Sequence, residues 1–257
     1  MPFVRYEEYG EHIRIITLNR PERLNAWGSE LAQETEEAFW RFANDPKARV
    51  AILRGEGKAF CAGADVKEWA ERGEAPGFRG RYRRVFTSEW GTPPLYKPVI
   101  GAVHGYCLGA GLNLVLMRCD IRIAAEGTKF GLPEVARGVM DLITPFGYQN
   151  IPTCFLAEMC YTADLVDAQR ALQFGMLNIV VPSERLMPTA LEIAQRIAQH
   201  SPRAVQMTKE NLLQVMAPPD RAFIREHLLR EQSFSAPDAQ EGMRAWVEKR
   251  PPRWQST

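Results

Sequence analysis

Two glycine-rich segments of this sequence have residue types and spacing that suggest chemistry. Residues 57–68 (GKAFCAGADVKE) and residues 104–113 (HGYCLGAGLN) each follow a short apolar run and lead into a helical pattern. Small residues let another molecule approach the backbone, and the start of a helix presents N–H groups that have no acceptor within the helix. Two such N–H groups directed at one point form an oxyanion hole. One turn alone would indicate only a tight connection, whereas the pair predicts a site that stabilises negative charge on an oxygen atom.

The segments that must position these turns alternate between strand and helix patterns. Short apolar runs rich in β-branched residues predict strands at residues 13–18, 50–53, 99–103, 121–125 and 179–181. After the first strand, Ser29 is expected to cap a helix that stops at residues 44–46. Short apolar strands that alternate with helices indicate crossover connections, so the sequence predicts an α/β fold with a largely parallel sheet.

The last third of the chain is dominated by helical patterns. They cover residues 168–174, 186–199, 203–215, 219–233 and 239–248. We therefore expect an α/β core at residues 1–197, followed by a helical C-terminal subdomain at residues 198–257.

The composition excludes several classes of protein. A chain of 257 residues can bury a sizeable core, and its 32 Lys and Arg residues against 31 Asp and Glu residues leave a net charge of +1. A protein that holds nucleic acid through phosphate contacts usually has a basic excess, so we expect no nucleic-acid partner. The sequence has neither a run of about 18 apolar residues nor a signal-peptide pattern, which predicts a cytoplasmic protein without membrane contact.

The cysteines and histidines do not suggest a metal site. The five cysteines include no CxxC pair, and none of the four histidines is paired with another at a ligand spacing. We expect reduced thiols that pack as small hydrophobic side chains, and no bound metal.

Several segments together resemble one family. They are LNRP at residues 18–21, LNA at 24–26, AFCAGAD at 59–65, KPVIGAVHG at 97–105, LGAG at 108–111, CD at 119–120, FGLPE at 130–134, residues 168–182 and EGMRAWVEKR at 241–250. In this order they span essentially the whole chain and resemble the enoyl-CoA hydratase/isomerase family, whose members have the crotonase fold. The resemblance implies stacked ββα turns, a helical C-terminal subdomain used for assembly, and a homotrimer or homohexamer.

The resemblance also implies an acyl-CoA thioester as substrate, with coenzyme A as part of that substrate and no separate cofactor. In this family two backbone N–H groups polarise the thioester carbonyl and stabilise an enolate, and by position they belong to Ala64 and Ala110. Arg23 and Lys67 correspond to phosphate contacts, with an ordinary surface cation as the competing interpretation of each. The full set implied to bind coenzyme A is Arg23, Ala26, Ala62, Ala64, Asp65, Val66 and Lys67.

The carboxylates decide which reaction such a site performs. Typical hydratases of the family use two glutamates, of which the second corresponds to Glu134, whereas Asn113 occupies the position of the first. An amide can orient water by hydrogen bonding but cannot take up a proton. Glu134 therefore either moves a proton between carbons alone, works with Asn113 as a water-orienting group, or shares the work with Asp141. For Asp141 the competing interpretation is a helix cap or a loop ion pair, and for Glu134 it is a solvated carboxylate.

The leading hypothesis is an enoyl-CoA hydratase-type enzyme, that is, a lyase that adds water to an enoyl-CoA. The alternatives within the family are an enoyl-CoA isomerase or a specialised acyl-CoA lyase that uses Glu134 alone. From another class, the arginines of residues 79–84 suggest a non-catalytic protein that binds coenzyme A or RNA. A nicotinamide-dependent oxidoreductase is disfavoured because neither glycine-rich turn reads GxGxxG.

Overall fold

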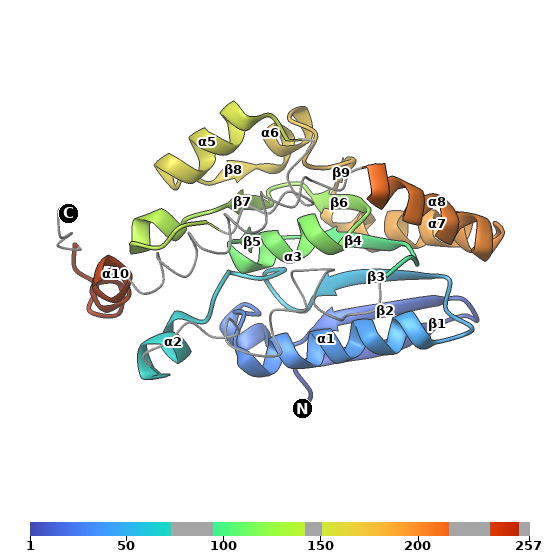
Figure 1. Cartoon of the computed structure of the whole chain (residues 1–257), viewed down its shortest axis with the longest axis horizontal. Helices are drawn as coiled ribbons and strands as arrows, with labels where there is room; N and C mark the ends of the chain where they lie inside the picture. The colour runs from blue at the N-terminus through green and yellow to red at the C-terminus, as the bar shows by residue number, and fades with distance from the viewer. Residues whose placement is uncertain (73–94, 142–150, 216–236, 252–257) are drawn as a thin grey trace.

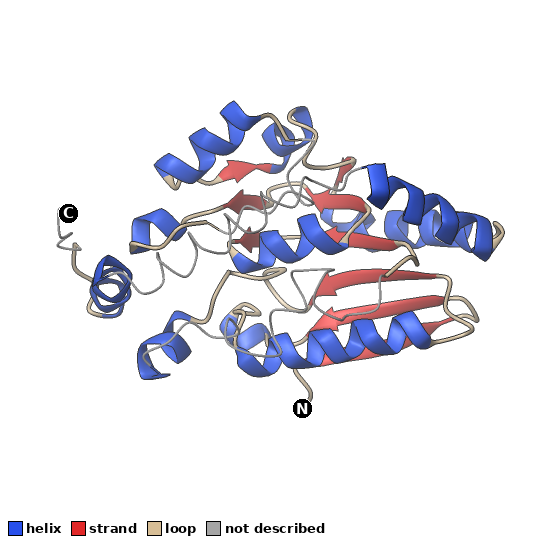
Figure 2. Cartoon of the chain, in the orientation of Figure 1, coloured by secondary structure: helices blue, strands red, loops and turns tan. Residues whose placement is uncertain are grey.

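Two β-sheets lie at the centre of the computed structural model, which describes residues 1–72, 95–141, 151–215 and 237–251 (Figures 1 and 2). The larger sheet has the order β1 (Val4–Tyr9), β2 (Ile13–Leu18), β3 (Val50–Gly55), β4 (Val99–Val103), β6 (Ile121–Ala125) and β9 (Ile179–Val181). Its first two strands are antiparallel, and every later pair is parallel. The predicted α/β fold with a largely parallel sheet is therefore confirmed.

The smaller sheet extends two of these strands beyond their carboxyl ends. It has the order β5 (Tyr106–Leu108), β7 (Lys129–Gly131) and β8 (Val166–Asp167). Strand β5 follows β4 and leads into helix α3 (Ala110–Arg118), while β7 follows β6 and leads into the 3-10 helix η3 (Glu134–Arg137). Because β5 and β7 pair in parallel, the segment before α3 lies beside the segment before η3. These are the stacked ββα turns that the resemblance implies, and they bring two potential sites of chemistry together.

The central strands β3 and β4 are buried on both faces of the larger sheet, which explains why they are largely apolar runs. Successive side chains of β3 point to opposite faces. Val50 and Ile52 pack with helix α7 (Leu186–Ala198), whereas Ala51 and Leu53 share a core with helix α1 (Ser29–Asn44). Helices α5 (Thr153–Thr162) and α6 (Ala168–Gln173) also bury residues in the core that contains α1.

One of the helices near the C-terminus packs against elements from earlier in the chain. Helix α8 (Pro202–Val215) follows α7, and α10 (Pro237–Val247) contacts both η3 and helix α2 (Val66–Arg72). Figure 1 shows α2 and α10 together at the end of the molecule that carries the C-terminus. The boundary between residues 197 and 198 stays a prediction. The helix predicted at residues 219–233 and the arginines of residues 79–84 lie outside the described residues.

The expected cap of α1 is wrong. Gly28 is the N-cap and Ser29 is the first helical residue, so the serine side chain does not cap the helix. The Ser29 N–H instead donates to Glu68 Oε2 at 3.1 Å, and its hydroxyl donates to Glu68 Oε1. A carboxylate at this end of a helix is favoured by the helix dipole. The group that serves α1 therefore comes from α2, which a local sequence pattern does not reveal.

Among the helices of the described ranges, none is long and apolar enough to cross a membrane.

Candidate active site

The two glycine-rich turns lie side by side after the adjacent strands β3 and β4. The Cys61 N–H donates to the Tyr106 carbonyl at 3.0 Å, and the Leu108 N–H donates to the Cys61 carbonyl at the same distance. Gly63 and Gly109 have φ angles of +95° and +48°, which favour glycine. The backbone hydrogen bonds therefore hold the two turns in one register, as the sequence predicts for turns on neighbouring strands.

The backbone N–H groups of Ala64 and Ala110 lie at the start of the segments that follow the two glycines; Ala64 lines the cavity beside these turns, whereas Ala110 is buried and does not. The glycine before each alanine is held by a backbone hydrogen bond. The Trp27 N–H donates to the Gly63 carbonyl, and the Gly109 N–H donates to the Gly131 carbonyl. Ala110 begins α3, where an N–H has no acceptor within the helix. Within the part of the chain that the structure describes, neither alanine N–H donates to a protein acceptor. Their role as oxyanion donors stays a prediction that this geometry permits.

The first turn is held from behind by Asn25, which is completely buried. Its Oδ1 accepts a hydrogen bond from the Arg20 N–H at 2.7 Å. Its Nδ2 donates to the carbonyls of Glu56 and Ala59 at 2.9 and 2.8 Å. One amide therefore ties the loop of Arg23 and Ala26 to the start of the first glycine-rich turn.

Replacing Asn25 with alanine is expected to lower the free energy of unfolding by about 2–4 kcal/mol, because several backbone groups lose their partner, one of them fully buried. Asn25 also has a φ of +54°, which alanine tolerates less well than asparagine. Denaturant titration monitored by circular dichroism measures this loss. Asn19→Ala is the control, because its amide makes an exposed hydrogen bond with the Pro2 carbonyl. Equal losses in the two variants would contradict the role given to Asn25.

Glu134 stands over the second glycine-rich turn at the start of η3. A Cβ atom at Gly109 would lie 2.5 Å from Glu134 Oε1, so the absence of a side chain at Gly109 makes room for the carboxyl group. Glu134 Oε2 is buried and has no hydrogen-bond partner among the described residues. The carboxyl group thus lies next to the N-terminus of α3, close to the Ala110 N–H.

Asp141 lies behind Glu134 and forms a carboxyl pair with it. Asp141 is buried, and the side chains of the two residues are joined by a hydrogen bond. Burial raises the pKa of Glu134 well above its ordinary value, and the hydrogen bond and charge of Asp141 raise it further. Burial also raises the pKa of Asp141. Two adjacent buried carboxyl groups do not readily ionise together, so this arrangement disfavours a state in which both carry a negative charge.

Cys160 of α5 is a third member of this group that the sequence did not indicate. Its thiol is hydrogen-bonded to the Asp141 carboxyl group, and burial is the main reason that its pKa is raised. The thiol therefore stays neutral and acts as a donor. We expected the cysteines to serve only as packed hydrophobic side chains, and nothing in their spacing distinguishes this one.

Asn113 has a different environment from the carboxyl pair. It is completely buried in α3, and its Nδ2 donates to the Gly109 carbonyl at 3.2 Å. It does not belong to the lining of the neighbouring cavity. The structure thus brings Glu134 together with Asp141 and leaves Asn113 one helical turn inside α3.

A cavity of about 320 Å³ is lined by most of the predicted site residues, although Ala110, Asn113 and Asp141 do not belong to its lining. Its lining contains Gly109, Glu134 and every residue implied to bind coenzyme A, namely Arg23, Ala26, Ala62, Ala64, Asp65, Val66 and Lys67. The two cations of that set are exposed. Asp65 is buried, and its carboxylate forms an ion pair with Arg20 at 2.7 Å. Contact of these residues with coenzyme A stays a prediction.

The cavity is also lined by residues that sequence reasoning missed. They are Glu22, Leu24, Gly63, Trp69, Leu108, Pro133, Arg137, Val139, Met243 and Trp246. The last two come from α10, which lies so close to η3 that a Cβ atom at Gly242 would be 1.8 Å from the Arg137 carbonyl oxygen. The sequence marked this segment only as part of the family resemblance, because no local pattern shows which elements a helix contacts.

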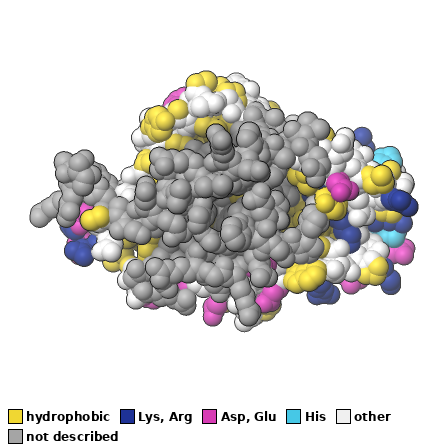
Figure 3. Space-filling model, viewed as in Figure 1, with side chains coloured by type: hydrophobic (Ala, Val, Ile, Leu, Met, Phe, Trp, Pro, Cys, Tyr) yellow, Lys and Arg dark blue, Asp and Glu magenta, His cyan; other side chains and the backbone are white. Residues whose placement is uncertain are grey.

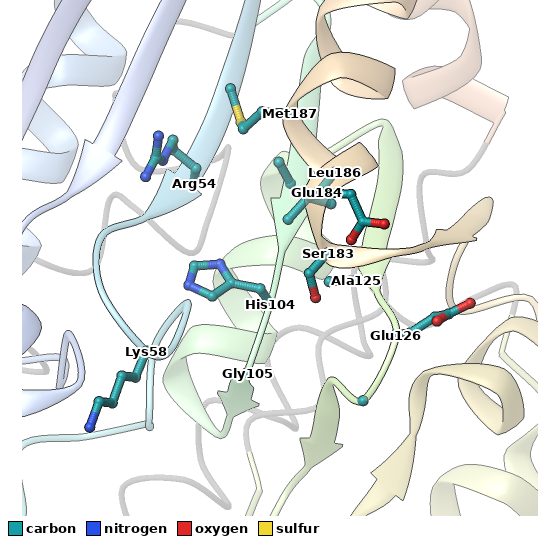
Figure 4. Close-up of a pocket in the computed structure, with 12 residues that line it drawn as sticks. Arg54, Lys58, His104, Gly105, Ala125, Glu126, Ser183, Glu184, Leu186 and Met187 are labelled. Atoms are coloured by element: carbon teal, nitrogen blue, oxygen red, sulfur yellow. The ribbon is translucent and has the colours of Figure 1, made fainter.

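A second cavity of about 450 Å³ lies at the carboxyl ends of β3, β4 and β6, next to the start of α7 (Figure 4). Arg54 lines it from the end of β3 and Lys58 from the turn that follows, whereas Glu126 follows β6 and Glu184 lies in the 3-10 helix η4 (Ser183–Arg185) just before α7. It contains none of the predicted site residues.

Charged side chains are visible at both ends of the face that Figure 3 shows. Lys and Arg side chains lie at the end that carries the β1–β2 turn and α8, and others lie at the opposite end, near α10. The cavity that holds Glu134 is lined by residues of α2 and α10 at that opposite end.

Known proteins are similar to this chain over its whole length. The model of the enoyl-CoA hydratase/isomerase family matches residues 8–257. Mevalonyl-coenzyme A hydratase of Aspergillus fumigatus is 36% identical over 95% of this chain and 91% of its own length. Crotonyl-CoA hydratase of Syntrophomonas wolfei is 36% identical over 95% of this chain and 94% of its own length. The crystal structure of carnitinyl-CoA hydratase from Mycobacterium avium superposes with a TM-score of 0.85 at 30% identity, covering 99% of both chains.

These similarities settle the predictions of fold and class. The crotonase fold is confirmed, because a solved structure of the family matches the full length of the chain. The prediction of a hydratase-type acyl-CoA enzyme is confirmed as well, since the relatives are named hydratases. With its two glycine-rich turns and the carboxyl group above them, the chain is an enzyme and belongs to the enoyl-CoA hydratase/isomerase family.

Proposed function

We propose that this enzyme adds water across the C2–C3 double bond of an enoyl-CoA, with Glu134 as the residue that handles the protons. The observation that carries the proposal is the position of the Glu134 carboxyl group, which lies over Gly109 and lines the same cavity as Ala64. The neighbouring Ala110 N–H has no acceptor among the residues that the structure describes. Hydration of a thioester requires a proton carrier and N–H donors close to one space; Ala64 lines this cavity, and Ala110 directly follows its lining residue Gly109.

The proton balance uses the carboxyl pair as a unit. As water attacks C3, the oxygen–carbon bond forms, and the electrons of the double bond move onto the thioester oxygen. The N–H groups of Ala64 and Ala110 stabilise the resulting enolate. Glu134 takes the proton that water loses, while the proton that the pair already holds shifts to Asp141. Glu134 then gives a proton to C2, the carbonyl re-forms, and the pair again holds one proton.

Asp141 and Asn113 have supporting roles in this proposal. Asp141 lies outside the cavity lining and acts through Glu134, so it is a residue that sets the pKa of Glu134 and receives its shared proton. Asn113 donates to the Gly109 carbonyl and thereby stabilises the turn that presents the Ala110 N–H.

An enoyl-CoA isomerase is the second candidate. Asn113 replaces the first of the two glutamates that the resemblance leads us to expect, and a single carboxyl group above the turn is sufficient to move a proton between carbons. The relatives named hydratases favour the first candidate.

The remaining parts of the proposal rest on the family and on the chemistry of the pair. Proton transfer by carboxyl groups needs no redox group and no metal, so we propose that the enzyme uses no cofactor apart from the coenzyme A portion of its substrate. We also propose a homotrimer or homohexamer, for which sedimentation should give a mass of three or six chains. The cytoplasmic location stays a prediction from the sequence.

The test is to supply the purified enzyme with 2-enoyl-CoA and 3-enoyl-CoA esters of the same chain length. Hydration is expected to consume the 2-enoyl ester and to place oxygen from isotopically labelled water on C3. Rapid conversion of the 3-enoyl ester to the 2-enoyl ester without hydration would instead support the isomerase. Failure of both reactions over several acyl groups would contradict the function proposed for Glu134.

A further inference from the structure

Arg137 brings a positive charge into the candidate active site that the proposed chemistry does not use. It ends η3, three residues after Glu134, and its half-buried side chain lines the same cavity. Its Nη1 donates to the Pro133 carbonyl at 3.0 Å. Its Nε is buried without a hydrogen-bond partner among the described residues, and no carboxylate of those residues forms an ion pair with it.

A half-buried guanidinium group without an ion-pair partner among the described residues is stabilised by an anionic ligand. Moving a charge out of water is costly unless an opposite charge and hydrogen bonds compensate. Burial indeed lowers the pKa of Arg137, and Glu134 is the acidic group whose charge acts on it. Glu134, however, is buried beside Asp141, and both its burial and this neighbouring carboxyl group disfavour its negative charge. The cavity is therefore electrostatically prepared for an anionic ligand group close to Glu134.

The position of Arg137 identifies which part of the substrate carries that anion. The cations implied to meet the phosphates of coenzyme A, Arg23 and Lys67, belong to other segments and are exposed. Arg137 instead shares one short helix with Glu134, the group that acts on C2 and C3 of the acyl chain. Its neighbours in the cavity include an apolar group formed by Trp69, Val139 and Met243. An acyl chain with an apolar segment and a terminal anion matches this combination.

We propose that Arg137 binds a carboxylate carried by the acyl group, so that the enzyme hydrates an enoyl-CoA with a second carboxylate rather than a plain fatty acyl chain. The planar guanidinium presents its N–H groups in a geometry that matches a carboxylate. The inference rests on the proposed function, because it takes the acyl group to lie beside Glu134.

The first experiment measures binding without turnover. Saturated CoA esters are compared in pairs of equal chain length by calorimetry: succinyl with butyryl, glutaryl with valeryl, and adipyl with hexanoyl. The wild-type protein is expected to bind at least one dicarboxylic ester about tenfold more tightly than its partner, as is usual for a charge-assisted hydrogen bond in a partly buried site. Arg137→Gln is expected to abolish this preference, and Arg137→Lys to retain part of it.

Arg23→Gln is the matched control for this series. A cation that contacts the phosphates of coenzyme A should weaken both esters of a pair by the same factor, because both carry the same phosphates. If Arg137→Gln behaves in this way, its guanidinium binds coenzyme A and the inference is overturned. A wild-type protein without preference in any of the three pairs overturns it as well, whether or not the variants fold.

A second experiment separates this inference from the proposed function. Hydration rates are compared for 2-hexenoyl-CoA and 2-hexenedioyl-CoA, which differ only in the terminal carboxylate. We expect kcat/KM to favour the dicarboxylic substrate in the wild type, and Arg137→Gln to remove that advantage through a higher KM. Hydration of 2-hexenoyl-CoA with no binding preference for any dicarboxylic ester would sustain the proposed function and overturn the inference. A binding preference that Arg137→Gln abolishes, without hydration of either substrate, would overturn the proposed function and sustain only the binding of the acyl carboxylate by Arg137.

Discussion

Replacing Glu134 with glutamine is expected to lower kcat for hydration of an enoyl-CoA by about 10²–10⁴-fold, the usual contribution of a positioned general acid–base group. Glutamine keeps the size of the side chain but cannot take a proton from water or give one to C2. KM should change little, because the residues implied to bind coenzyme A lie on other segments of the cavity wall. The loss of absorbance of the enoyl thioester in stopped-flow and steady-state assays measures both constants.

Glu126→Gln is a suitable control for this variant. It neutralises a carboxylate at the second cavity, away from Glu134, and should leave kcat unchanged. The thermal unfolding temperature of Glu134→Gln should not fall, since the substitution removes a buried titratable group rather than a packing contact. Wild-type kcat in the Glu134 variant would show that another group carries the protons.

Replacing Asp141 with asparagine is expected to lower kcat/KM at neutral pH by at least about tenfold, because the pair loses the group that accepts the shared proton. The pH dependence should change as well. Burial is the first reason that the pKa of Glu134 is raised, and the hydrogen bond and charge of Asp141 are the next. Without that charge the pKa of Glu134 falls, so Glu134 gives up its proton at a lower pH. The limb of the kcat/KM profile that reports the ionisation of Glu134 as the base should therefore move to lower pH, whereas an Asp141 that only caps a loop would leave the profile in place.

Stability measurements provide a second check on the pair. Both carboxyl groups have raised pKa values in the folded protein, so the folded state binds protons more tightly than the unfolded state above the ordinary carboxyl pKa. The free energy of unfolding of the wild type should consequently fall as the pH rises through that range. Asp141→Asn removes the repulsion between the two groups and should be relatively more stable at alkaline pH. A difference between variant and wild type that is the same at every pH would contradict the shared proton.

Local patterns predicted the elements that carry the two turns. The β-branched runs at residues 13–18 and 99–103 are strands with those same bounds, because strands buried on both faces must be apolar along their whole length. The turns were also predictable, since a backbone that passes through positive φ at Gly63 and Gly109 selects glycine whatever the rest of the fold does.

Interactions between distant segments were not predictable in the same way. Serine is a common N-cap residue, yet Ser29 does not cap α1. The carboxylate of Glu68 accepts a hydrogen bond at the N-terminus of α1 instead, because α2 packs against that end of the helix. For Asp141 the sequence allowed a catalytic role, a helix cap or a loop ion pair. Only its position beside Glu134 in the folded protein shows that the two residues form a carboxyl pair. The spacing of residues in the sequence does not show which carboxyl groups are buried next to one another, and this burial is what raises the pKa values of Glu134 and Asp141.

The sequence by itself determined the class of this protein. It has glycine-rich turns after neighbouring strands, apolar strands for a parallel sheet, and one glutamate after a proline turn. The order of these features along the chain resembles a single family. Each of these features is required by the backbone within a few residues. Only the tertiary structure decided that Asp141 lies close enough to raise the pKa of Glu134, and that Arg137 and α10 complete the cavity. Those properties depend on burial and on electrostatic interactions between segments far apart in the chain, and both arise only when the elements pack.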